Sequence, residues 1–360
     1  MKYIDEFRDP HLAGEIAKQI EREALGSYHL MEFCGGHTHA VSRHGIKSLL
    51  PHNVSMIHGP GCPVCVLPVG RIDNAIGIAE KAILCTYADM MRVPASGGGS
   101  LMQARASGAD IRMVYSSQDA VRIARAHPER EVVFFAIGFE TTAPSTAAAI
   151  IEAQDLDNFS VFCNHVLTPP AMQSILDTPD LRLNGILGPS HVSTVIGTKA
   201  YEGIVSAYKV PMVIAGFEPL DVMQSILMLV RQLNEGRAEV ENEYTRAVSH
   251  DGNLKAQRLM EQVFVVRPSF EWRGLGEVPS SALSIAESYS SFDAESRFCI
   301  AYTPVPDAKA CECGEVLRGL KQPQDCRVFG TACTPSNPIG ACMVSSEGAC
   351  AAHYAYGRTA

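Results

Sequence analysis

The sequence predicts an α/β protein with two open parallel-sheet domains of similar build and an irregular, mostly helical and loop C-terminal domain. Short apolar runs alternate with helix-like segments from Tyr28 to about residue 216, which is the pattern of a parallel sheet with crossover helices. A length of 360 residues suits two to three domains. Six of the twelve cysteines fall within the last fifty residues, among glycines and prolines rather than in an apolar run.

The first element is a helix, since Asp9 suits the N-cap, Pro10 suits the first helical position, and apolar residues recur at helical spacing to Ala24. Strands are expected near residues 29–33, 54–58, 82–87, 110–115, 131–138, 159–164, 184–188 and 210–216. Helices fill most gaps, including Thr38–Leu50 and Val69–Lys81. From about His250 a helix runs to about Val263, and loops rich in Pro, Gly and Ser follow.

Two short echoes indicate related halves. Gly138-Phe-Glu140 and Gly216-Phe-Glu218 both end apolar strands, and Ile57-His-Gly-Pro resembles Ile186-Leu-Gly-Pro. We therefore predict one α/β domain over residues 25–115 and a second over 116–245. Residues 1–24 and 246–360 are assigned to the third, cysteine-rich domain, organised by its metal.

The tail cysteines predict a metal site. The N-terminus lacks the apolar core of a signal peptide, and no run approaches the ~18 apolar residues of a membrane span, so we expect a cytoplasmic chain with reduced thiols. Zinc favours paired Cys-x-x-Cys ligands, which the tail lacks. The dispersed spacing of Cys313, Cys326, Cys333 and Cys350 suits a [4Fe-4S] cube, with Cys311 and Cys342 as alternates. Spacing alone leaves zinc open.

Two N-terminal segments carry further thiols. Glu32-Phe-Cys34-Gly-Gly-His37-Thr-His39 and His58-Gly-Pro-Gly-Cys62-Pro-Val-Cys65 each follow a strand-like run and open through glycines into a helix. Strand, glycine turn and helix place functional groups at the carboxyl edge of a sheet, so both segments are predicted to meet at one edge. We expect an exposed Cys34 thiolate, stabilised by the helix N-terminus.

The Cys62-x-x-Cys65 spacing at a helix start favours a reversible dithiol/disulfide couple. The default for His37 and His39 is a satisfied loop histidine. Cys85, Cys163 and Cys299 lie in apolar runs and are assigned to the core.

Two further sequence features, Glu140 and the segment 97–100, each allow more than one role. Glu140 follows a strand and precedes Pro144, so it either caps a helix or faces the Cys34 cleft and relays a proton. Gly97-Gly-Gly-Ser100 has the composition of a phosphate-binding turn, but no Gly-x4-Gly-Lys-Ser/Thr pattern exists, and we predict a flexible loop. The net charge of −9 argues against nucleic-acid binding, which needs a basic face.

These motifs together resemble the HypD family, scaffold proteins of [NiFe]-hydrogenase maturation. The resemblance rests on Cys34-Gly-Gly-His-Thr-His, Gly59-Pro-Gly-Cys-Pro-Val-Cys65, Gly138-Phe-Glu-Thr-Thr-Ala-Pro144 and the tail from Cys313-Gly to Gly348-Ala-Cys350, in order over about residues 5–357. It implies a HypC-type partner with which an iron atom is held while two cyanides and one carbon monoxide are assembled on it. It also implies that cyanide arrives from HypE, whose C-terminal cysteine HypF modifies with carbamoyl phosphate. The finished Fe(CN)2CO unit would then pass to the hydrogenase large-subunit precursor.

Carried onto this sequence, the resemblance makes Cys34 the iron ligand, with His37, Cys62 and Cys65 as further candidate ligands or catalytic residues. Cys62 and Cys65 become the redox pair beside the iron, and the tail becomes the [4Fe-4S] site in place of zinc. Two other functions were weighed: an iron–sulfur thiol–disulfide oxidoreductase acting on a protein partner, and a structural metalloprotein with a zinc tail. The first gives Cys34-Gly-Gly-His37 no role.

Overall fold

Two parallel sheets form the body of the protein, and the predicted α/β fold class is confirmed. The structure is a computed structural model that describes residues 5–179 and 181–357; residues 1–4 and 358–360 of the predicted third domain lie outside the described residues. Sheet A has the order β2 (Val54–His58), β1 (Tyr28–Glu32), β7 (Gly185–Gly188), β8 (Met212–Ile214), β9 (Val240–Asn242). Sheet B has the order β4 (Ile111–Met113), β3 (Ile83–Thr86), β5 (Val132–Gly138), β6 (Phe159–His165). All eight predicted strands are present, and β9 is additional.

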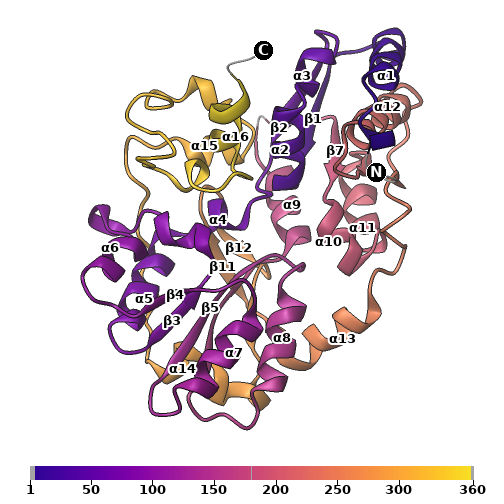
Figure 1. Cartoon of the computed structure of the whole chain (residues 1–360). Helices are drawn as coiled ribbons and strands as arrows, with labels where there is room; N and C mark the ends of the chain where they lie inside the picture. The colour runs from indigo at the N-terminus through magenta and orange to yellow at the C-terminus, as the bar shows by residue number, and fades with distance from the viewer. Residues whose placement is uncertain (1–4, 180, 358–360) are drawn as a thin grey trace.

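Helices cover both faces of each sheet (Figure 1). Around sheet A they are α1 (Pro10–Glu23), α2 (Gly35–Arg43), α3 (Ile46–Leu49), α9 (Thr168–Leu176), α10 (Ser190–Ile196), α11 (Lys199–Tyr208) and α12 (Pro219–Asn234). Around sheet B they are α4 (Pro63–Val66), α5 (Val69–Ala79), α6 (Leu101–Ala106), α7 (Ser117–Ala126), α8 (Ala143–Glu152) and α13 (Leu254–Val263). Four apolar clusters result, one on each face of each sheet, so each strand reads as a near-continuous apolar run.

The chain passes between the sheets twice, after β2 and after β6. The predicted ranges 25–115 and 116–245 therefore do not coincide with the sheets, because each range supplies strands to both. Alternation of strands and helices indicates a parallel sheet but does not reveal which strands are neighbours: β1 pairs with β7, more than 150 residues later in the chain. The first crossing carries Cys62 and Cys65.

The N-terminal helix α1 forms as expected, but it does not pack with the cysteine-rich domain to which residues 1–24 were assigned. Asp9 caps α1 by accepting from the backbone N–H of His11 at 2.8 Å, and Pro10 is its first residue. The helix lies on α12 rather than on the cysteine-rich region, and Arg231 donates to Glu23 at 2.8 Å.

The segment after α13 divides into two parts. Two small antiparallel ribbons pack against the body, and Trp272, the last residue of β11, is buried in this packing. They consist of β10 (Phe264–Val266), β13 (Leu283–Ile285), β11 (Ser269–Trp272) and β12 (Gly276–Pro279). The cysteine-rich part has only short elements: α15 (Cys313–Leu317), η5 (Pro323–Asp325), η6 (Ala341–Met343) and α16 (Ala349–Tyr356). It lies against α2 and α4, in yellow in Figure 1.

The remaining short elements are α14 (Ala294–Arg297) and the 3-10 helices η1 (Asp5–Phe7), η2 (Ala88–Arg92), η3 (Ser96–Gly98) and η4 (Glu287–Phe292). The prediction that Cys299 lies in the core is wrong: it is exposed and has a left-handed φ of 51° just beyond α14. Its apolar run is too short to form a strand after a capped polar helix. Cys85 and Cys163 are buried as predicted.

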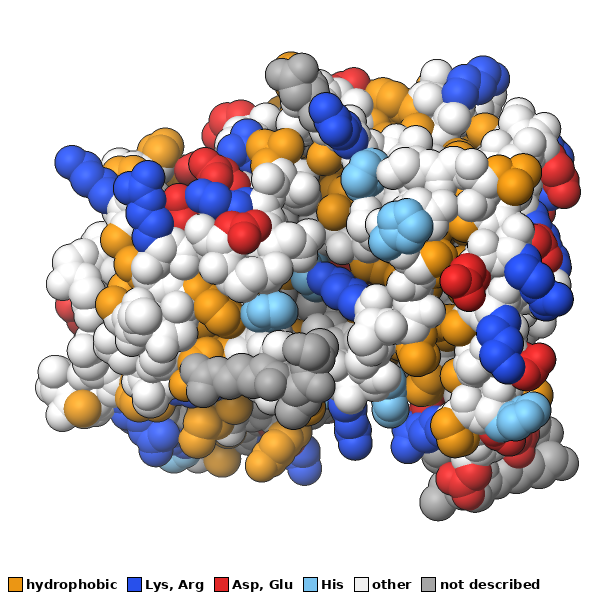
Figure 2. Space-filling model, turned by 90° about the horizontal axis from the view of Figure 1, so that it is seen from above, with side chains coloured by type: hydrophobic (Ala, Val, Ile, Leu, Met, Phe, Trp, Pro, Cys, Tyr) orange, Lys and Arg blue, Asp and Glu red, His pale blue; other side chains and the backbone are white. Residues whose placement is uncertain are grey.

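The charged side chains are mixed on the face of the molecule drawn in Figure 2. On the face seen from above, acidic and basic side chains are interspersed, and histidines gather near its centre (Figure 2). That face carries no continuous basic field of the kind that nucleic acid requires. None of the helices within the described residues combines the length and apolar character that a membrane span requires.

Candidate functional site

A cleft of about 390 Å³ opens where the two sheets and the cysteine-rich region meet. Cys34 at the end of β1 and Gly61 after β2 line one part of it, and Phe139 after β5 lines another. His191 of α10 and Glu347 of the tail complete its rim. The prediction that both N-terminal thiol segments meet at one sheet edge agrees with this arrangement, because Gly35 donates its N–H to the Gly61 carbonyl at 3.0 Å.

Two glycines allow this convergence. A Cβ on Gly61 would lie 2.5 Å from both the backbone nitrogen and the Cα of Cys34. A Cβ on Gly35 would lie 2.6 Å from the Cβ of Glu347. The glycines serve close approach between segments, since neither has a positive φ.

Cys34 is the N-cap of α2, but its thiol does not have the predicted character. Only 8% of the residue is exposed. Burial first, and then the Glu347 carboxylate, raise the pKa of Cys34 to about 12, against the lowering effect of the Gly36 and His37 N–H groups. The expectation of an exposed thiolate is wrong, because removal from water outweighs the helix N-terminus.

A buried carboxyl holds the backbone of Cys34. Glu32 accepts from the Cys34 N–H at 3.2 Å and from the Thr38 hydroxyl. The Nδ1 of His58 lies 2.9 Å from the same carboxyl. Burial raises the pKa of Glu32 to about 8.

Further contacts connect His58 to the cysteine-rich region. Lys47 Nζ lies 3.2 Å from His58 Nε2 and donates to Gln322 Oε1 at 3.2 Å. A single polar network therefore links the turn at Cys34 to the cysteine-rich region. Glu32 and His58 lie within the two thiol motifs, but the motif sequences alone do not indicate that these two side chains meet.

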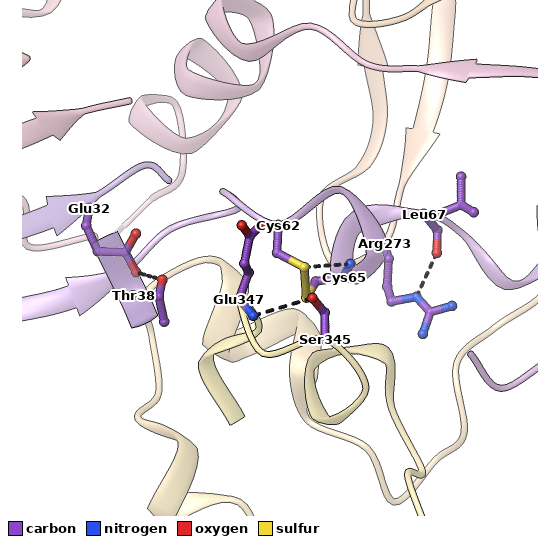
Figure 3. The surroundings of a disulfide bond; sticks show 8 residues. All are labelled: Glu32, Thr38, Cys62, Cys65, Leu67, Arg273, Ser345 and Glu347. Carbon is purple, nitrogen blue, oxygen red and sulfur yellow. Dashed lines mark hydrogen bonds between the residues drawn. A yellow bond between two sulfur atoms is a disulfide. The ribbon is translucent and has the colours of Figure 1, made fainter. Parts of the chain in front are cut away.

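Cys62 and Cys65 are joined by a disulfide, with Cα atoms 5.2 Å apart, as their spacing permits (Figure 3). Cys62 caps α4, and its sulfur accepts from the Cys65 N–H. The pair is buried, with 3% of Cys62 and none of Cys65 exposed. The tail segment with Ser345 and Glu347 runs past it in Figure 3.

His37 is buried and does not line the cleft. Its Nε2 lies 3.0 Å from the Gly216 carbonyl and 3.1 Å from that of Ala215, so Nε2 carries the hydrogen. Burial lowers the pKa of His37 to about 4. The imidazole is neutral and ties α2 to the end of β8.

The position of Glu140 does not fit the predicted role of a proton relay in the Cys34 cleft. It is not among the cleft-lining residues, whereas Phe139, Thr141 and Thr142 are. Its carboxylate accepts from the backbone N–H of Thr168 at 2.8 Å and from the Thr168 hydroxyl at 2.9 Å. Burial raises the pKa of Glu140 to about 7. The capping alternative describes its position, although the helix that it caps is the distant α9.

The tail thiols converge. The sulfurs of Cys311 and Cys313 lie against Gly340, where a Cβ would collide with both. Hydrogen bonding to Cys313 and burial raise the pKa values of Cys311 and Cys342, and the charge of Cys350 adds to the second. Cys313, Cys333, Cys342 and Cys350 all belong to the buried cluster that extends from sheet B into the tail, and the pKa of Cys333 is raised by burial first and then by the charges of Cys313 and Cys311. Cys326 differs, because it hydrogen-bonds Glu312 and is not part of that cluster.

The tail cysteines form no disulfide within the described residues. No three His, Cys, Asp or Glu side chains in that same part of the chain surround one point as ligands of a single ion. A [4Fe-4S] cube asks for a different arrangement, since its thiolates bind separate irons. A set of thiols that converges without pairing fits such a group.

Sequence reasoning missed two cleft residues. His191 packs against Phe217 with ring centroids 4.2 Å apart and the rings tilted by 47°, and Glu347 lines the same cleft as Cys34. His191 follows β7 through Gly188-Pro189, the same strand-and-turn pattern that identified Cys34, and the echo with Ile57-His-Gly-Pro pointed to it. Glu347 had no such signal, because nothing in a loop sequence says where it folds back.

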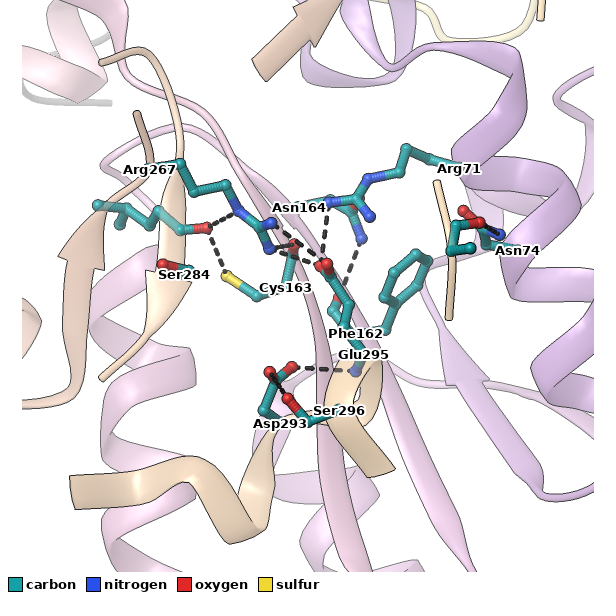
Figure 4. A network of polar contacts seen from close by, with 12 residues as sticks. Arg71, Asn74, Phe162, Cys163, Asn164, Arg267, Ser284, Asp293, Glu295 and Ser296 are labelled. Atoms are coloured by element: carbon teal, nitrogen blue, oxygen red, sulfur yellow. Dashed lines mark hydrogen bonds and ion pairs between the residues drawn. The ribbon is translucent and has the colours of Figure 1, made fainter. Parts of the chain in front are cut away.

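One polar network lies away from the cleft and is structural. Arg71 and Arg267 share the carboxylate of Glu295 beside Cys163 (Figure 4). Burial raises the pKa of Cys163 to about 11, which keeps this thiol protonated. The network joins α5, α14 and the ribbon strands across sheet B.

Comparisons with known proteins agree with the motifs. The family model HypD, described as "Hydrogenase formation hypA family", matches residues 11–357. The chain is 64% identical over 370 residues to the hydrogenase maturation factor HypD of Cupriavidus necator, covering 99% of this chain and 98% of that protein. It is 48% identical over 367 residues to the hydrogenase maturation factor HypD of Escherichia coli K12, with coverage of 99% and 98%.

Proposed function

The chain belongs to the HypD family, and on that premise we propose that it is a hydrogenase maturation scaffold on which an Fe(CN)2CO unit is assembled. The observation that carries the proposal is the position of Cys34, whose side chain lines the cleft between the two sheets and the tail. Thiolate suits the soft, low-spin iron that binds cyanide and carbon monoxide. Iron is the cargo here, and Cys34 is its ligand from this chain.

The cleft suits small diatomic ligands. Phe33, Val64, Met90 and Phe139 give it apolar walls, which exclude water. The backbone N–H groups of Gly36 and His37 are directed at the Cys34 sulfur and stabilise negative charge on it without adding a net charge. Glu32 fixes the Cys34 backbone, so the sulfur is positioned before iron arrives.

The family premise supplies the partners. A HypC-type protein provides a second cysteine opposite Cys34, and HypE, after HypF has modified its C-terminal cysteine, delivers cyanide. The finished unit passes to the hydrogenase large-subunit precursor. The open rim at His191 and Glu347 is the side from which a partner thiol reaches Cys34. A cytoplasmic location, where free thiols stay reduced, suits this chemistry.

Cys62 and Cys65 support the assembly by redox chemistry. Oxidation of the two thiols to the disulfide releases two electrons and two protons, which equals the demand of a two-electron reduction in the cleft. Gly61 connects this pair directly to the Cys34 backbone, so the dithiol lies next to the iron ligand.

The tail is proposed to hold a [4Fe-4S] cluster through Cys313, Cys326, Cys333 and Cys350, with Cys311 and Cys342 as alternates. The convergence of free thiols around Gly340 supports a thiolate-bound group there. Such a cluster supplies single-electron transfer when bound. The alternatives Cys311 and Cys342 gain weight from their contacts with Cys313, which Cys326 lacks.

The oxidoreductase alternative is less well supported. A disulfide exchange with another protein needs one accessible sulfur of the pair, and Cys62 and Cys65 are both buried. Neither cysteine is among the cleft-lining residues, but their neighbours Gly61, Pro63 and Val64 are. The buried pair therefore lies beside the cleft, where it is better suited to exchanging electrons with the cleft than to disulfide exchange at the surface.

The experiment compares two single-atom substitutions. Cys34→Ser replaces the proposed ligand, and Cys299→Ser makes the same change at an exposed thiol away from the cleft. Each variant is co-expressed with the other maturation proteins, purified with its HypC-type partner, and examined by infrared spectroscopy. We expect cyanide and carbonyl bands in the Cys299→Ser complex and none in the Cys34→Ser complex. Bands of equal intensity in both complexes would exclude Cys34 as the assembly ligand.

A further inference from the structure

A second cleft, of about 560 Å³, lies beside the triglycine turn and shares no lining residue with the Cys34 cleft. The turn Ser96–Ser100 forms one wall, and Arg273 lies opposite with Asp307 and Asn337. The volume falls within the range of small-molecule sites and exceeds the need of a single inorganic ion.

Arg273 has more hydrogen-bonding capacity than the protein uses. Only 3% of the residue is exposed. Its backbone N–H donates to the Val66 carbonyl. Its Nε donates to the Leu67 carbonyl at 3.0 Å, which is the bond drawn in Figure 3. Asp307 lies 3.4 Å from Nε. The terminal Nη2 is buried and has no acceptor within the described residues.

A buried guanidinium nitrogen without an acceptor is costly, and an oxygen ligand that reaches Arg273 after a small rotation of its side chain would relieve that cost. Arg92 adds a second guanidinium to the cleft, held by the carbonyls of Pro335 and Val344. The lining residues include two arginines and one carboxylate, Asp307, while the carboxylate of Asp73 lies behind the triglycine turn and accepts from the Ser96 N–H at 2.9 Å. The guanidinium fork matches a carboxylate or a phosphoryl group.

The opposite wall leaves room for such a group. Gly97 and Gly98 have φ values of 63° and 80°, and a Cβ at either would meet nothing within 4 Å. The backbone there borders the cleft without side chains, and the hydroxyl and amide groups of Ser100 and Gln103 add polar partners.

We propose that this second cleft binds a small organic anion through a phosphoryl or carboxylate group held by Arg273 and Arg92. The site is independent of the iron chemistry at Cys34. It gives the Gly97-Gly-Gly-Ser100 segment a role in recognition without a P-loop pattern.

The test places a carboxylate in the cleft without damaging the fold. Ser100→Asp keeps a good N-cap on α6 and adds one negative charge to the lining. Asn253→Asp makes the same charge change at the N-cap of α13, away from the cleft, and is the matched control. Gln103→Glu is a second variant at an exposed lining position, for use if Ser100→Asp does not fold.

Full-length proteins are titrated with sodium phosphate and with sodium acetate, against sodium chloride of equal ionic strength. Melting temperature and calorimetric heat are recorded, since a ligand that binds only the native state raises the melting temperature. We expect saturable binding of at least one of the two anions to the wild type and to Asn253→Asp, weakened at least about tenfold in Ser100→Asp and Gln103→Glu.

The two anions distinguish the chemistry. Binding of phosphate alone identifies a phosphoryl ligand, and binding of acetate alone identifies a carboxylate ligand. No effect beyond that of chloride, or equal affinities in all four proteins, would overturn the proposal.

Discussion

Gly61 is the residue at which the two thiol segments touch, and replacing it with alanine tests the geometry of the cleft. The new Cβ would lie 2.5 Å from the backbone nitrogen and Cα of Cys34. Ordinary contact begins near 3.4 Å, so the overlap is about 0.9 Å (3.4 − 2.5). The atoms in the way are backbone atoms, and relief therefore requires moving the chain at Cys34.

The expected cost follows from two contributions. Overpacking of this kind costs about 1–3 kcal/mol. The hydrogen bond from Gly35 N–H to the Gly61 carbonyl is strained as well, at a cost of about 1 kcal/mol. We expect a loss of about 2–4 kcal/mol, or a fall in melting temperature of about 3–5 °C at ~1.3 °C per kcal/mol.

The control is Gly77→Ala in the interior of α5, where a new Cβ meets nothing within 4 Å. Alanine is the better helix former, so this variant should gain about 0.5–1 kcal/mol. Thermal unfolding and the infrared bands of the partner complex are measured for both. Gly61→Ala should lose stability and band intensity together, while Gly77→Ala should lose neither. Wild-type stability and wild-type bands in Gly61→Ala would refute the contact between the segments.

Three further outcomes are expected. Cys62 and Cys65 should be protected from alkylation together under oxidising conditions and released together by a dithiol reductant; independent alkylation of either thiol would contradict the couple. Cys333→Ala should remove iron and sulfide from the tail and destabilise it, because metal binding there is folding energy, and full retention of both would contradict the tail assignment. Burial lowers the pKa of His165 to about 4, below the value of about 6.5 in the unfolded chain, so its contribution to stability is complete above about pH 6.5 and is lost as the pH falls toward 4. Plotting the urea midpoint against pH should give a shallower acid slope for His165→Gln, and an unchanged slope would contradict this.

The sequence predicted the elements of the fold well and their pairing poorly. Apolar runs and cap residues are local signals, so Asp9, Pro10 and the eight strands were found close to their true positions. The neighbour of β1 is β7, and no local pattern encodes a contact across that separation. The predicted ranges therefore divided the chain in the wrong places relative to the sheets.

The candidate site shows the same limit. Cys34, Cys62 and Cys65 were predictable because a strand followed by a glycine turn fixes their place at a sheet edge. The ionisation state of Cys34 could not be predicted, because its pKa depends on burial by segments that are distant in sequence, including the one that carries Glu347. Glu140 was ambiguous for the same reason: its partner Thr168 lies 28 residues away.

The most direct test of the central claim is the infrared spectrum of the wild-type protein purified anaerobically with its HypC-type partner from cells that contain the full maturation system. The account predicts iron in the complex, two cyanide bands and one carbonyl band, and loss of all three when the Cys34 sulfur is replaced by oxygen. A wild-type complex that contains the tail iron but shows no cyanide or carbonyl band would contradict the proposal that iron is assembled with its ligands in this cleft.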